Sequence, residues 1–139
     1  MMTIPGRMLQ AAAIPVRAAK VCLITSSSGK RWVIPKGRLE VGKTVREIAL
    51  QEAWEEAGLH GRLHPHPVGS YIYEKWGTSC HVTVFLMDVT EVAKDWPERS
   101  LRKRRWLRPA QALAYISNHG MRGVLRTVCE SEGLYSLPR

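Results

Sequence analysis

The sequence predicts an α/β domain in which helices and strands pack as layers. Three observations support this: several short apolar segments have the pattern of strands, a strongly marked helix lies between them, and two further helical segments follow. The chain has 139 residues, 45% of them apolar, which suits one domain with its own core. We therefore expect a single domain over residues 1–139.

Five segments have the composition of strands. One apolar stretch ends at the turn signal 26–29, and a second, shorter one is stopped by Pro35. Two longer segments are separated by Gly77-Thr78-Ser79, which predicts a hairpin of antiparallel neighbours. The expected strands cover residues 18–25, 32–34, 68–75, 81–89 and 104–107.

The clearest helix begins after Thr44. Thr44 and Glu47 have the spacing of a capping box, and Gly58 suits the C-terminal stop after Ala57. An apolar stripe that recurs every four residues predicts the buried face: Val45, Ala49, Ala53 and Ala57. Two later helices are expected over residues 109–116, opened by Pro109, and over residues 121–130.

The net charge favours an anionic partner. Lysine and arginine number 21 against 12 aspartate and glutamate, which gives a formal charge of +9. Nucleic acid, a membrane surface and a small polyphosphate all suit this surplus, so charge alone does not choose among them. No apolar run is long enough to span a membrane, and residues 1–13 lack the apolar core of a signal peptide. We therefore expect no membrane partner.

The three cysteines are far apart and include no Cys-x-x-Cys pair. Cys22, Cys80 and Cys129 therefore favour neither a disulfide framework nor a cysteine-based zinc site. This usage is typical of a reducing compartment, and we expect the protein in the cytoplasm.

Three carboxylates share one side of the predicted helix. Glu52, Glu55 and Glu56 stand at i, i+3 and i+4, within an arc of about 100° beside the apolar stripe. Like charges so placed repel each other, and a divalent cation would relieve the repulsion. Hard oxygen ligands suit Mg²⁺. The alternative interpretation is a solvated acidic face.

The surroundings of these carboxylates resemble the Nudix box, which the family writes as G-x5-E-x7-R-E-U-x-E-E-x-G-U with U bulky and apolar. Residues 37–59 read GRLEVGKTVREIALQEAWEEAGL, and the preceding 32–36 look like the strand that enters the box. The resemblance implies a Nudix α/β/α sandwich with a mixed β-sheet between helices, and metal-dependent hydrolysis of a phosphoanhydride bond. The matching positions are Gly37, Glu52, Glu55, Glu56, Gly58 and Leu59, with Ala53 at a position that is usually bulkier.

Two residues depart from the box. Lys43 stands where the family has its first Glu, and Gln51 stands where the family has Arg. In the family these two positions can form a salt bridge that braces the loop against the helix. Because an amide can still form hydrogen bonds, we expect Gln51 to replace the brace, and we hypothesise that activity survives on Glu52, Glu55 and Glu56.

The resemblance also implies roles for individual residues. Glu52 and Glu56 would bind the metal directly, Glu55 would bind a second ion or share the first, and the Lys36 carbonyl would be a further ligand. The expected cofactor is Mg²⁺, with Mn²⁺ as an alternative. Catalysis is assigned to Glu52, Glu55 and Glu56. The base that accepts the proton of water stays open among Glu55, Glu91 and Glu98.

The second half of the chain resembles a Nudix subgroup, the diphosphoinositol polyphosphate phosphohydrolases, which also cleave diadenosine polyphosphates. Residues 95–96 and 102–106 carry this likeness, as do residues 32–35, although Lys36 stands where the subgroup usually has Gly. Because alternate strand residues share a face, Arg102 and Arg104 are the preferred phosphate contacts of the basic run. The full set expected to bind substrate is Arg31, Lys36, Gly37, Arg38, Arg102 and Arg104. The alternative is a basic edge that discourages aggregation.

Two further groups carry weaker signals. His64 and His66 have the spacing of zinc ligands on a strand, but the neighbouring prolines favour a loop or edge segment. Aromatic side chains at Tyr71, Tyr73 and Trp76 could stack on a base, although aromatic residues in strands more often serve packing. Base recognition stays open.

Three functions compete. The first is an enzyme that acts on a small-molecule polyphosphate. The second is a binding module that keeps the fold and has lost the chemistry, as the changes at Lys43 and Gln51 would allow. The third is an RNA-processing pyrophosphohydrolase, which the charge favours but no nucleic-acid-binding motif supports. The sequence leaves the physiological substrate and the oligomeric state open.

Overall fold

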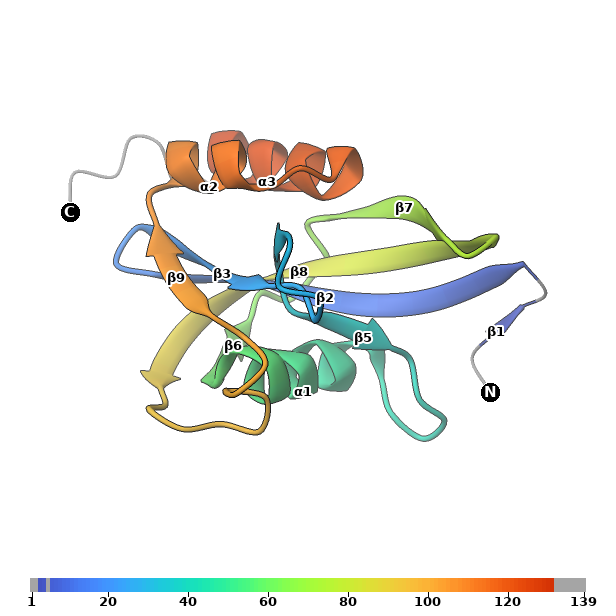
Figure 1. The fold of residues 1–139 in the computed structure, drawn as a ribbon, viewed down its shortest axis with the longest axis horizontal. Helices are drawn as coiled ribbons and strands as arrows, with labels where there is room; N and C mark the ends of the chain where they lie inside the picture. The colour runs from blue at the N-terminus through green and yellow to red at the C-terminus, as the bar shows by residue number, and fades with distance from the viewer. Residues whose placement is uncertain (1–2, 5, 132–139) are drawn as a thin grey trace.

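A mixed β-sheet lies between two layers of helices. The computed structural model describes residues 3–4 and 6–131 of the chain. Helix α1 (Val45–Ala57) covers one face of the sheet, and α2 (Pro109–Tyr115) and α3 (His119–Ser131) cover the other (Figure 1). The predicted fold class, a mixed sheet between helices, is confirmed. The strands are β1 (Thr3–Ile4), β2 (Arg7–Arg17), β3 (Lys20–Thr25), β4 (Trp32–Val33), β5 (Lys36–Arg38), β6 (Leu59–Leu63), β7 (Gly69–Lys75), β8 (Thr78–Val92) and β9 (Arg104–Leu107).

The centre of the sheet is the parallel pair β2 and β8. Their register runs from Arg7 opposite Ser79 to Val16 opposite Asp88. The other pairings are antiparallel: β3 continues from β2 toward β9 and β4, while β6 and β7 pair with successive halves of β8. β5, which contains Gly37, also pairs with β2 and therefore lies beside the centre of the sheet.

The central strands are buried on both faces. In β2, Ala12 and Ile14 join the core under α2 and α3, whereas Ala11 and Ala13 join the core under α1. Strands β3 and β8 divide in the same alternating way. Such strands read as almost continuous apolar runs, as expected for a sheet that is covered on both sides.

Helix α1 has the boundaries that its sequence predicts. The Thr44 hydroxyl accepts a hydrogen bond from the Glu47 backbone N–H, at 3.1 Å, and the Glu47 carboxylate accepts one from the Thr44 N–H, at 2.8 Å. Gly58 ends the helix in the left-handed region, with φ at 68°. The capping box is confirmed. Of the predicted buried face, Ala49, Ala53 and Ala57 are fully buried, whereas Val45 is only partly buried against the same core.

The structure corrects the first half of the strand prediction. The longest unpredicted element is β2, which contains Pro15 and a run of alanines that have low strand propensity. The strand expected from residue 18 begins at Lys20, because Ala18 and Ala19 form a turn with φ of 51° and 62°. Strands β1, β5 and β6 are not predicted from the sequence either.

The second half agrees better with the prediction. β7 and β8 are antiparallel neighbours, but the turn lies at Trp76 and Gly77, with φ of 51° and 75°, and β8 already begins at Thr78. Pro109 opens α2 as expected, and α3 starts two residues before its predicted beginning. No helix of the described part of the chain is long and apolar enough to cross a membrane.

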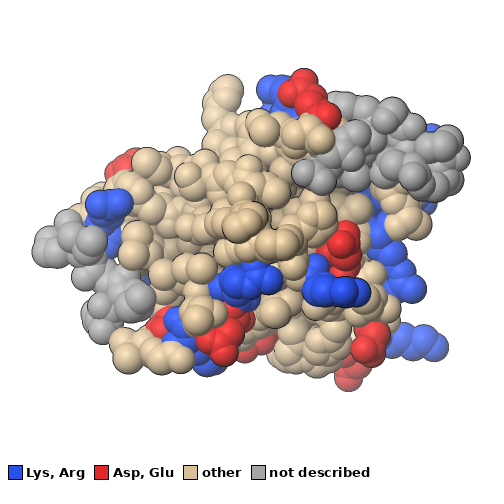
Figure 2. Space-filling view, turned by 180° about the vertical axis from the view of Figure 1, so that it is seen from behind, with Lys and Arg blue, Asp and Glu red and all other residues tan. Residues whose placement is uncertain are grey.

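Charged side chains are unevenly spread over the surface. Seen from behind, the middle of the molecule shows a broad uncharged area, and Lys, Arg, Asp and Glu gather below it on the α1 side (Figure 2). The positively charged side chains are therefore not distributed evenly over this face of the molecule.

Candidate active site

A cavity of about 630 Å³ opens between β5, α1 and the segment that leads into β9. Positive and negative side chains meet in its lining. The acidic residues are Glu40, Glu52 and Glu56, and the basic residues are Arg31, Lys36, Arg38, Lys75 and Arg102. The cavity therefore brings the α1 carboxylates Glu52 and Glu56 together with five basic side chains.

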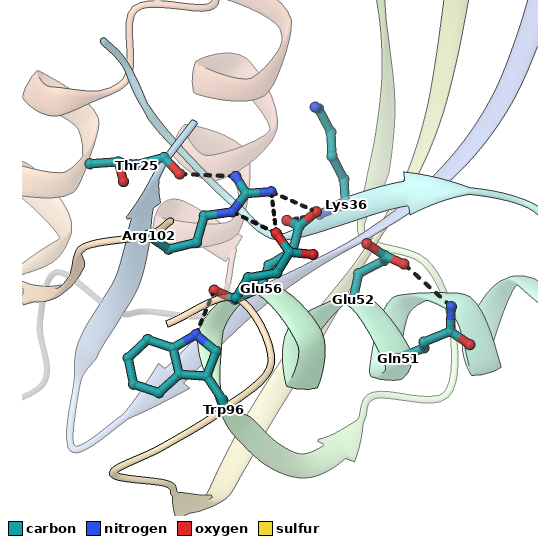
Figure 3. A network of polar contacts seen from close by, with 8 residues as sticks. Thr25, Lys36, Gln51, Glu52, Glu56, Trp96 and Arg102 are labelled. Carbon is teal, nitrogen blue, oxygen red and sulfur yellow. Dashed lines mark hydrogen bonds and ion pairs between the residues drawn. The ribbon is translucent and has the colours of Figure 1, made fainter. Parts of the chain in front are cut away.

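Glu52 and Glu56 project from α1 into this cavity (Figure 3). They are one helical turn apart, and Glu56 is only 8% exposed. Burial raises the pKa of Glu56 to about 8, against the attraction of Arg102 and with a further contribution from Glu52. Burial likewise raises the pKa of Glu52. Burial and mutual repulsion thus disfavour simultaneous ionisation of these two carboxyl groups, and added positive charge would favour it.

Gly37 allows the backbone of β5 to approach Glu52. A Cβ atom at residue 37 would lie 2.4 Å from Glu52 Cδ and 2.6 and 2.7 Å from its two carboxylate oxygens. No side chain fits there without displacing the carboxylate. The glycine of the box is thus required by the close approach of strand and helix.

The Lys36 backbone faces the box helix. Pro35 and Leu39 form hydrogen bonds with β2, at 3.1 Å each, and this alternation turns the Lys36 N–H and carbonyl away from β2. The Lys36 N–H donates to Glu56 Oε1 at 3.3 Å. Its ammonium group lies 5.1 Å from the centre of the Tyr73 ring, and burial lowers its pKa.

Arg102 links the cavity to the loop that precedes β9. Its guanidinium contacts Glu56 Oε2 at 3.2 Å and Glu98 Oε1 at 2.9 Å, and it also donates to the Thr25 carbonyl at 3.0 Å (Figure 3). The Arg102 side chain is 10% exposed. It therefore occupies the cationic position beside the buried carboxylate.

The structure brings five of the six predicted substrate-binding residues to the cavity: Arg31, Lys36, Gly37, Arg38 and Arg102. Arg104 does not line the cavity, because its guanidinium donates to the carbonyls of Ala57 and Ala93, at 2.8 Å each. Residue 102 precedes β9, so the expected strand alternation does not put both arginines on one face.

The remaining predicted carboxylates lie outside the cavity lining. The Glu55 side chain is partly buried, and its backbone carbonyl accepts a hydrogen bond from the Glu98 N–H at 3.0 Å. Glu91 is exposed near the end of β8, opposite His60. Of the three candidate bases, Glu98 is the one whose carboxylate pairs with a cavity residue, Arg102.

The two departures from the box form a new brace. The Lys43 ammonium donates to the Gln51 amide oxygen and lies 3.5 Å from Glu40 Oε1. The Gln51 amide nitrogen donates to Glu40 Oε2 at 2.8 Å. Glu40 thus supplies the carboxylate that position 43 lacks, and the expected replacement of the brace is confirmed.

Sequence reasoning misses several lining residues. Gln10 and Met8 belong to β2, which the sequence does not mark as a strand, and Lys75 is expected only as part of a hairpin. Gln10 is 8% exposed and accepts a hydrogen bond from the Tyr73 hydroxyl at 2.9 Å. The one available signal is the apolar run that flanks Gln10.

The aromatic and histidine residues with weaker sequence signals lie at different sites in the structure. Tyr73 lines the cavity, whereas Tyr71 is buried in the core under α3, and Trp76 is 93% exposed at the hairpin tip. His64 Nε2 forms a hydrogen bond with Asp88 Oδ2 at 3.0 Å. His66 follows in the loop between β6 and β7.

The donor set of the cavity suits magnesium. Within residues 3–4 and 6–131, no three His, Cys, Asp or Glu side chains form a ready cluster around one point. Mg²⁺ commonly takes only one or two carboxylates from a protein and completes its shell with water and substrate phosphates. Glu52, Glu56 and the Lys36 carbonyl can provide such a partial shell.

Comparison with known proteins decides the family. A sequence model of the NUDIX domain matches residues 6–128. The chain belongs to the Nudix family. The Nudix domain is 37% identical over 106 residues to "Nudix hydrolase 12, mitochondrial" of Arabidopsis thaliana, a match that covers 70% of this chain and 52% of that protein. It is 33% identical over 107 residues to "Diphosphoinositol polyphosphate phosphohydrolase 3-alpha" of Mus musculus, which covers 74% of this chain and 63% of that protein.

Solved structures confirm the fold of the Nudix domain. The E. coli ORF135 protein superposes with a TM-score of 0.74 at 20% identity, covering 95% of this chain and 94% of that one. The C. elegans Ap4A hydrolase gives 0.73 at 20% identity, covering 90% and 98%. The family predicted from the box is thus confirmed, and the Nudix domain spans about half to two thirds of the length of these curated relatives.

Proposed function

We propose that the Nudix domain hydrolyses a phosphoanhydride bond in a nucleoside diphosphate-linked or polyphosphorylated small molecule, with Mg²⁺ or Mn²⁺ as cofactor. The observation that carries this proposal is the composition of the cavity. Two neighbouring carboxylates, Glu52 and Glu56, share it with five basic side chains. Such a cavity can hold a divalent cation and bind several phosphate groups around it.

Each part of the cavity has a role in this reaction. Glu52, Glu56 and the Lys36 carbonyl would hold the cation, and Glu55 is a further candidate ligand. When bound, the cation supplies positive charge between carboxylates and phosphates and acidifies the attacking water. Arg31 and Arg38 orient the phosphates through charge-assisted hydrogen bonds.

A carboxylate must accept the proton of the attacking water. Glu98 has the best support for this role, because it is held against the cavity residue Arg102 at 2.9 Å. Glu55 and Glu91 remain alternatives; none of the three side chains lines the cavity itself, and Glu98 is preferred only for its contact with Arg102.

A diphosphoinositol polyphosphate or a diadenosine polyphosphate is the favoured substrate. The cavity gathers five basic side chains, among them Lys75, which is not expected there from the sequence, and this number favours a substrate with several phosphate groups over a single diphosphate. The names of the mouse relative and of the C. elegans structure refer to the same two substrate classes.

A binding module is the second candidate function, and the Arg102 contact supports it. Arg102 pairs with Glu56 at 3.2 Å, and this contact competes with a cation for the same carboxylate. A protein that only binds an anionic ligand would keep this pair. An RNA-processing pyrophosphohydrolase is a lesser alternative.

A substrate panel tests the proposal. Nucleoside triphosphates, a sugar nucleotide, diadenosine tetraphosphate, a diphosphoinositol polyphosphate and a 5′-triphosphorylated RNA are incubated with Mg²⁺, Mn²⁺ or EDTA. We expect metal-dependent release of phosphate products, lost in Glu56→Gln and kept in the matched control Glu130→Gln on the opposite helix layer. Substrate binding without turnover would support the binding module, and preferential cleavage of the RNA would support the third function.

We also propose that the protein resides in a reducing compartment such as the cytoplasm. Cys22 and Cys80 are buried thiols that form no disulfide. Burial raises the pKa of Cys22 to about 12, which keeps it in the unreactive thiol form. Fractionation of cells that express the tagged protein tests this proposal.

A further inference from the structure

The C-terminal end of α1 is held by the segment between β8 and β9, residues 93–103. A helix leaves its last carbonyl groups without partners inside the helix, and α1 has no basic residue in its last turn to help. The carbonyls of four consecutive residues nevertheless receive donors from residues 93–104. The pairs are Glu98 N–H to Glu55 at 3.0 Å, Trp96 Nε1 to Glu56 at 3.1 Å, Arg104 Nη1 to Ala57 at 2.8 Å and Ala93 N–H to Gly58 at 2.9 Å.

Two of these donors are side chains that support each other. The Arg104 guanidinium lies 4.1 Å from the centre of the Trp96 ring, and its second arm donates to the Ala93 carbonyl at 2.8 Å. The Trp96 ring in turn lies directly on Gly58, where a Cβ atom would come within 2.7 Å of it. The Trp96 indole is therefore packed between Gly58 at the end of α1 and the Arg104 guanidinium.

The same loop ends in the cavity. Glu98 and Arg102 stand four residues apart, and the Glu98 carboxylate accepts a hydrogen bond from Arg102 Nε at 3.0 Å. Arg102 then reaches the Glu56 carboxylate at 3.2 Å. Glu56 is therefore contacted twice by this segment, through its backbone carbonyl by Trp96 and through its carboxylate by Arg102 (Figure 3).

Neither Trp96 nor Arg104 lines the cavity, so their contacts link them to it only through neighbouring residues. We infer that Trp96 and Arg104 are positioning residues: they fix segment 93–103 to the end of α1 and thereby set Glu98 and Arg102 against Glu56. This inference rests on the proposed hydrolysis only for its kinetic consequences. The claim that the two residues fix segment 93–103 to α1 concerns the protein without any ligand.

The first experiment follows amide hydrogen exchange in the ligand-free protein. Trp96→Phe keeps a ring under Arg104 but removes the N–H that reaches Glu56. Because one net hydrogen bond is lost, the Glu98 amide should exchange about three- to tenfold faster. Trp76→Phe is the matched control, since Trp76 is 93% exposed and far from this segment in sequence. Unchanged exchange at Glu98 in Trp96→Phe would overturn the inference, whatever the protein's activity.

The second experiment is kinetic and uses the best substrate of the panel. Trp96→Phe and Arg104→Gln should lower kcat severalfold, with Arg104→Lys intermediate and the exposed neighbour Arg99→Gln unchanged. In an Arg102→Gln background, the change at residue 96 should have little further effect, because the positioned group is already gone. Independent effects that multiply in the double variant would show that Trp96 does not act through Arg102.

These results separate the two proposals. A wild-type protein that cleaves nothing would refute the proposed function, while the exchange experiment would still test the positioning role. A cleaving enzyme with normal exchange in Trp96→Phe would leave the function intact and refute the positioning role. A stability change alone, with unaltered kcat and unaltered Glu98 exchange, would also refute it.

Discussion

Replacing Gly37 with alanine should damage activity while leaving the fold intact. The new Cβ would lie 2.4 Å from Glu52 Cδ, whereas carbon atoms in contact prefer about 3.5 Å. The Glu52 carboxylate must therefore retreat by about 1 Å. Because that group is the far end of a flexible side chain, the backbone need not move, and the free energy of unfolding should change by less than about 1 kcal/mol.

The same displacement should be costly for catalysis. Misplacing a catalytic group by about 1 Å can lower the rate by about 100-fold, which corresponds to about 2.7 kcal/mol of transition-state stabilisation. We expect kcat/KM to fall by that order in Gly37→Ala and the affinity for Mn²⁺ to fall with it. Steady-state kinetics, electron paramagnetic resonance of bound Mn²⁺ and thermal unfolding measure the three quantities.

Two other glycines provide controls. A Cβ atom added at Gly123 in α3 would have no neighbouring atom within 4 Å, so Gly123→Ala should leave activity unchanged and stabilise the protein by about 0.5–1 kcal/mol. At Gly61 a Cβ would meet the Asp88 carbonyl oxygen at 2.2 Å, so Gly61→Ala should lower stability instead. A folded Gly37→Ala protein with wild-type kcat/KM and Mn²⁺ affinity would refute the reasoning.

Three further predictions concern the brace, the buried acid and the substrate. Gln51→Ala should lower the free energy of unfolding by about 0.5–1 kcal/mol in urea denaturation, because the contact with Lys43 is lost; no change would show that the brace is dispensable. The raised pKa of Glu56 means that the folded state holds a proton that the unfolded state releases above pH 4.5. Stability without metal should therefore fall by up to about 1.4 kcal/mol per pH unit as pH rises from 4.5 toward 8, and Glu56→Gln should flatten this slope; a stability that rises over that window would contradict the assignment. Charge reversal at Lys75 should raise KM more for a diphosphoinositol polyphosphate than for a nucleoside diphosphate compound, whereas Arg104 reversal should lower kcat and stability without such a substrate-dependent rise in KM; equal KM effects at Lys75 would argue against a polyphosphate pocket.

The box helix can be predicted almost completely because its signals are local. The capping box at Thr44, the glycine stop and the apolar stripe all lie within one helix, so their physical meaning does not depend on distant residues. The two departures from the box, Lys43 and Gln51, also predict that a different contact replaces the salt bridge between these positions. Its third member, Glu40, has no such signal, because only the folded loop brings it to Gln51 at 2.8 Å.

The central strand cannot be predicted in the same way because its stability comes from its neighbours. The alanines of β2 have no strong strand propensity, and they adopt this conformation since β8 and β5 pair with both edges and both faces are buried. The hydrogen bond from Tyr73 to Gln10 could not be predicted from the sequence either, because it depends on the position of β2 in the sheet.

The role of Arg104 shows a different limit of sequence reasoning. A basic run beside a predicted strand indicates phosphate contacts, and Arg102 does reach the cavity. Arg104, two positions further on, instead donates hydrogen bonds to the backbone carbonyls of Ala57 and Ala93, near the end of α1. Two arginines two positions apart thus have different roles: Arg102 pairs with a carboxylate of the cavity, and Arg104 binds backbone carbonyls.

Alanine side chains form part of the contact between α1 and the sheet. Ala49, Ala53 and Ala57 of the helix share one core with Ala11 and Ala13 of β2, and all five are fully buried. Small side chains at this contact keep the distance between helix and sheet short, so the position of Glu52 and Glu56 relative to β5 depends on residues outside the cavity lining. We expect a valine in place of Ala11 or Ala13 to push α1 away from the sheet and so to displace Glu52 and Glu56 relative to β5.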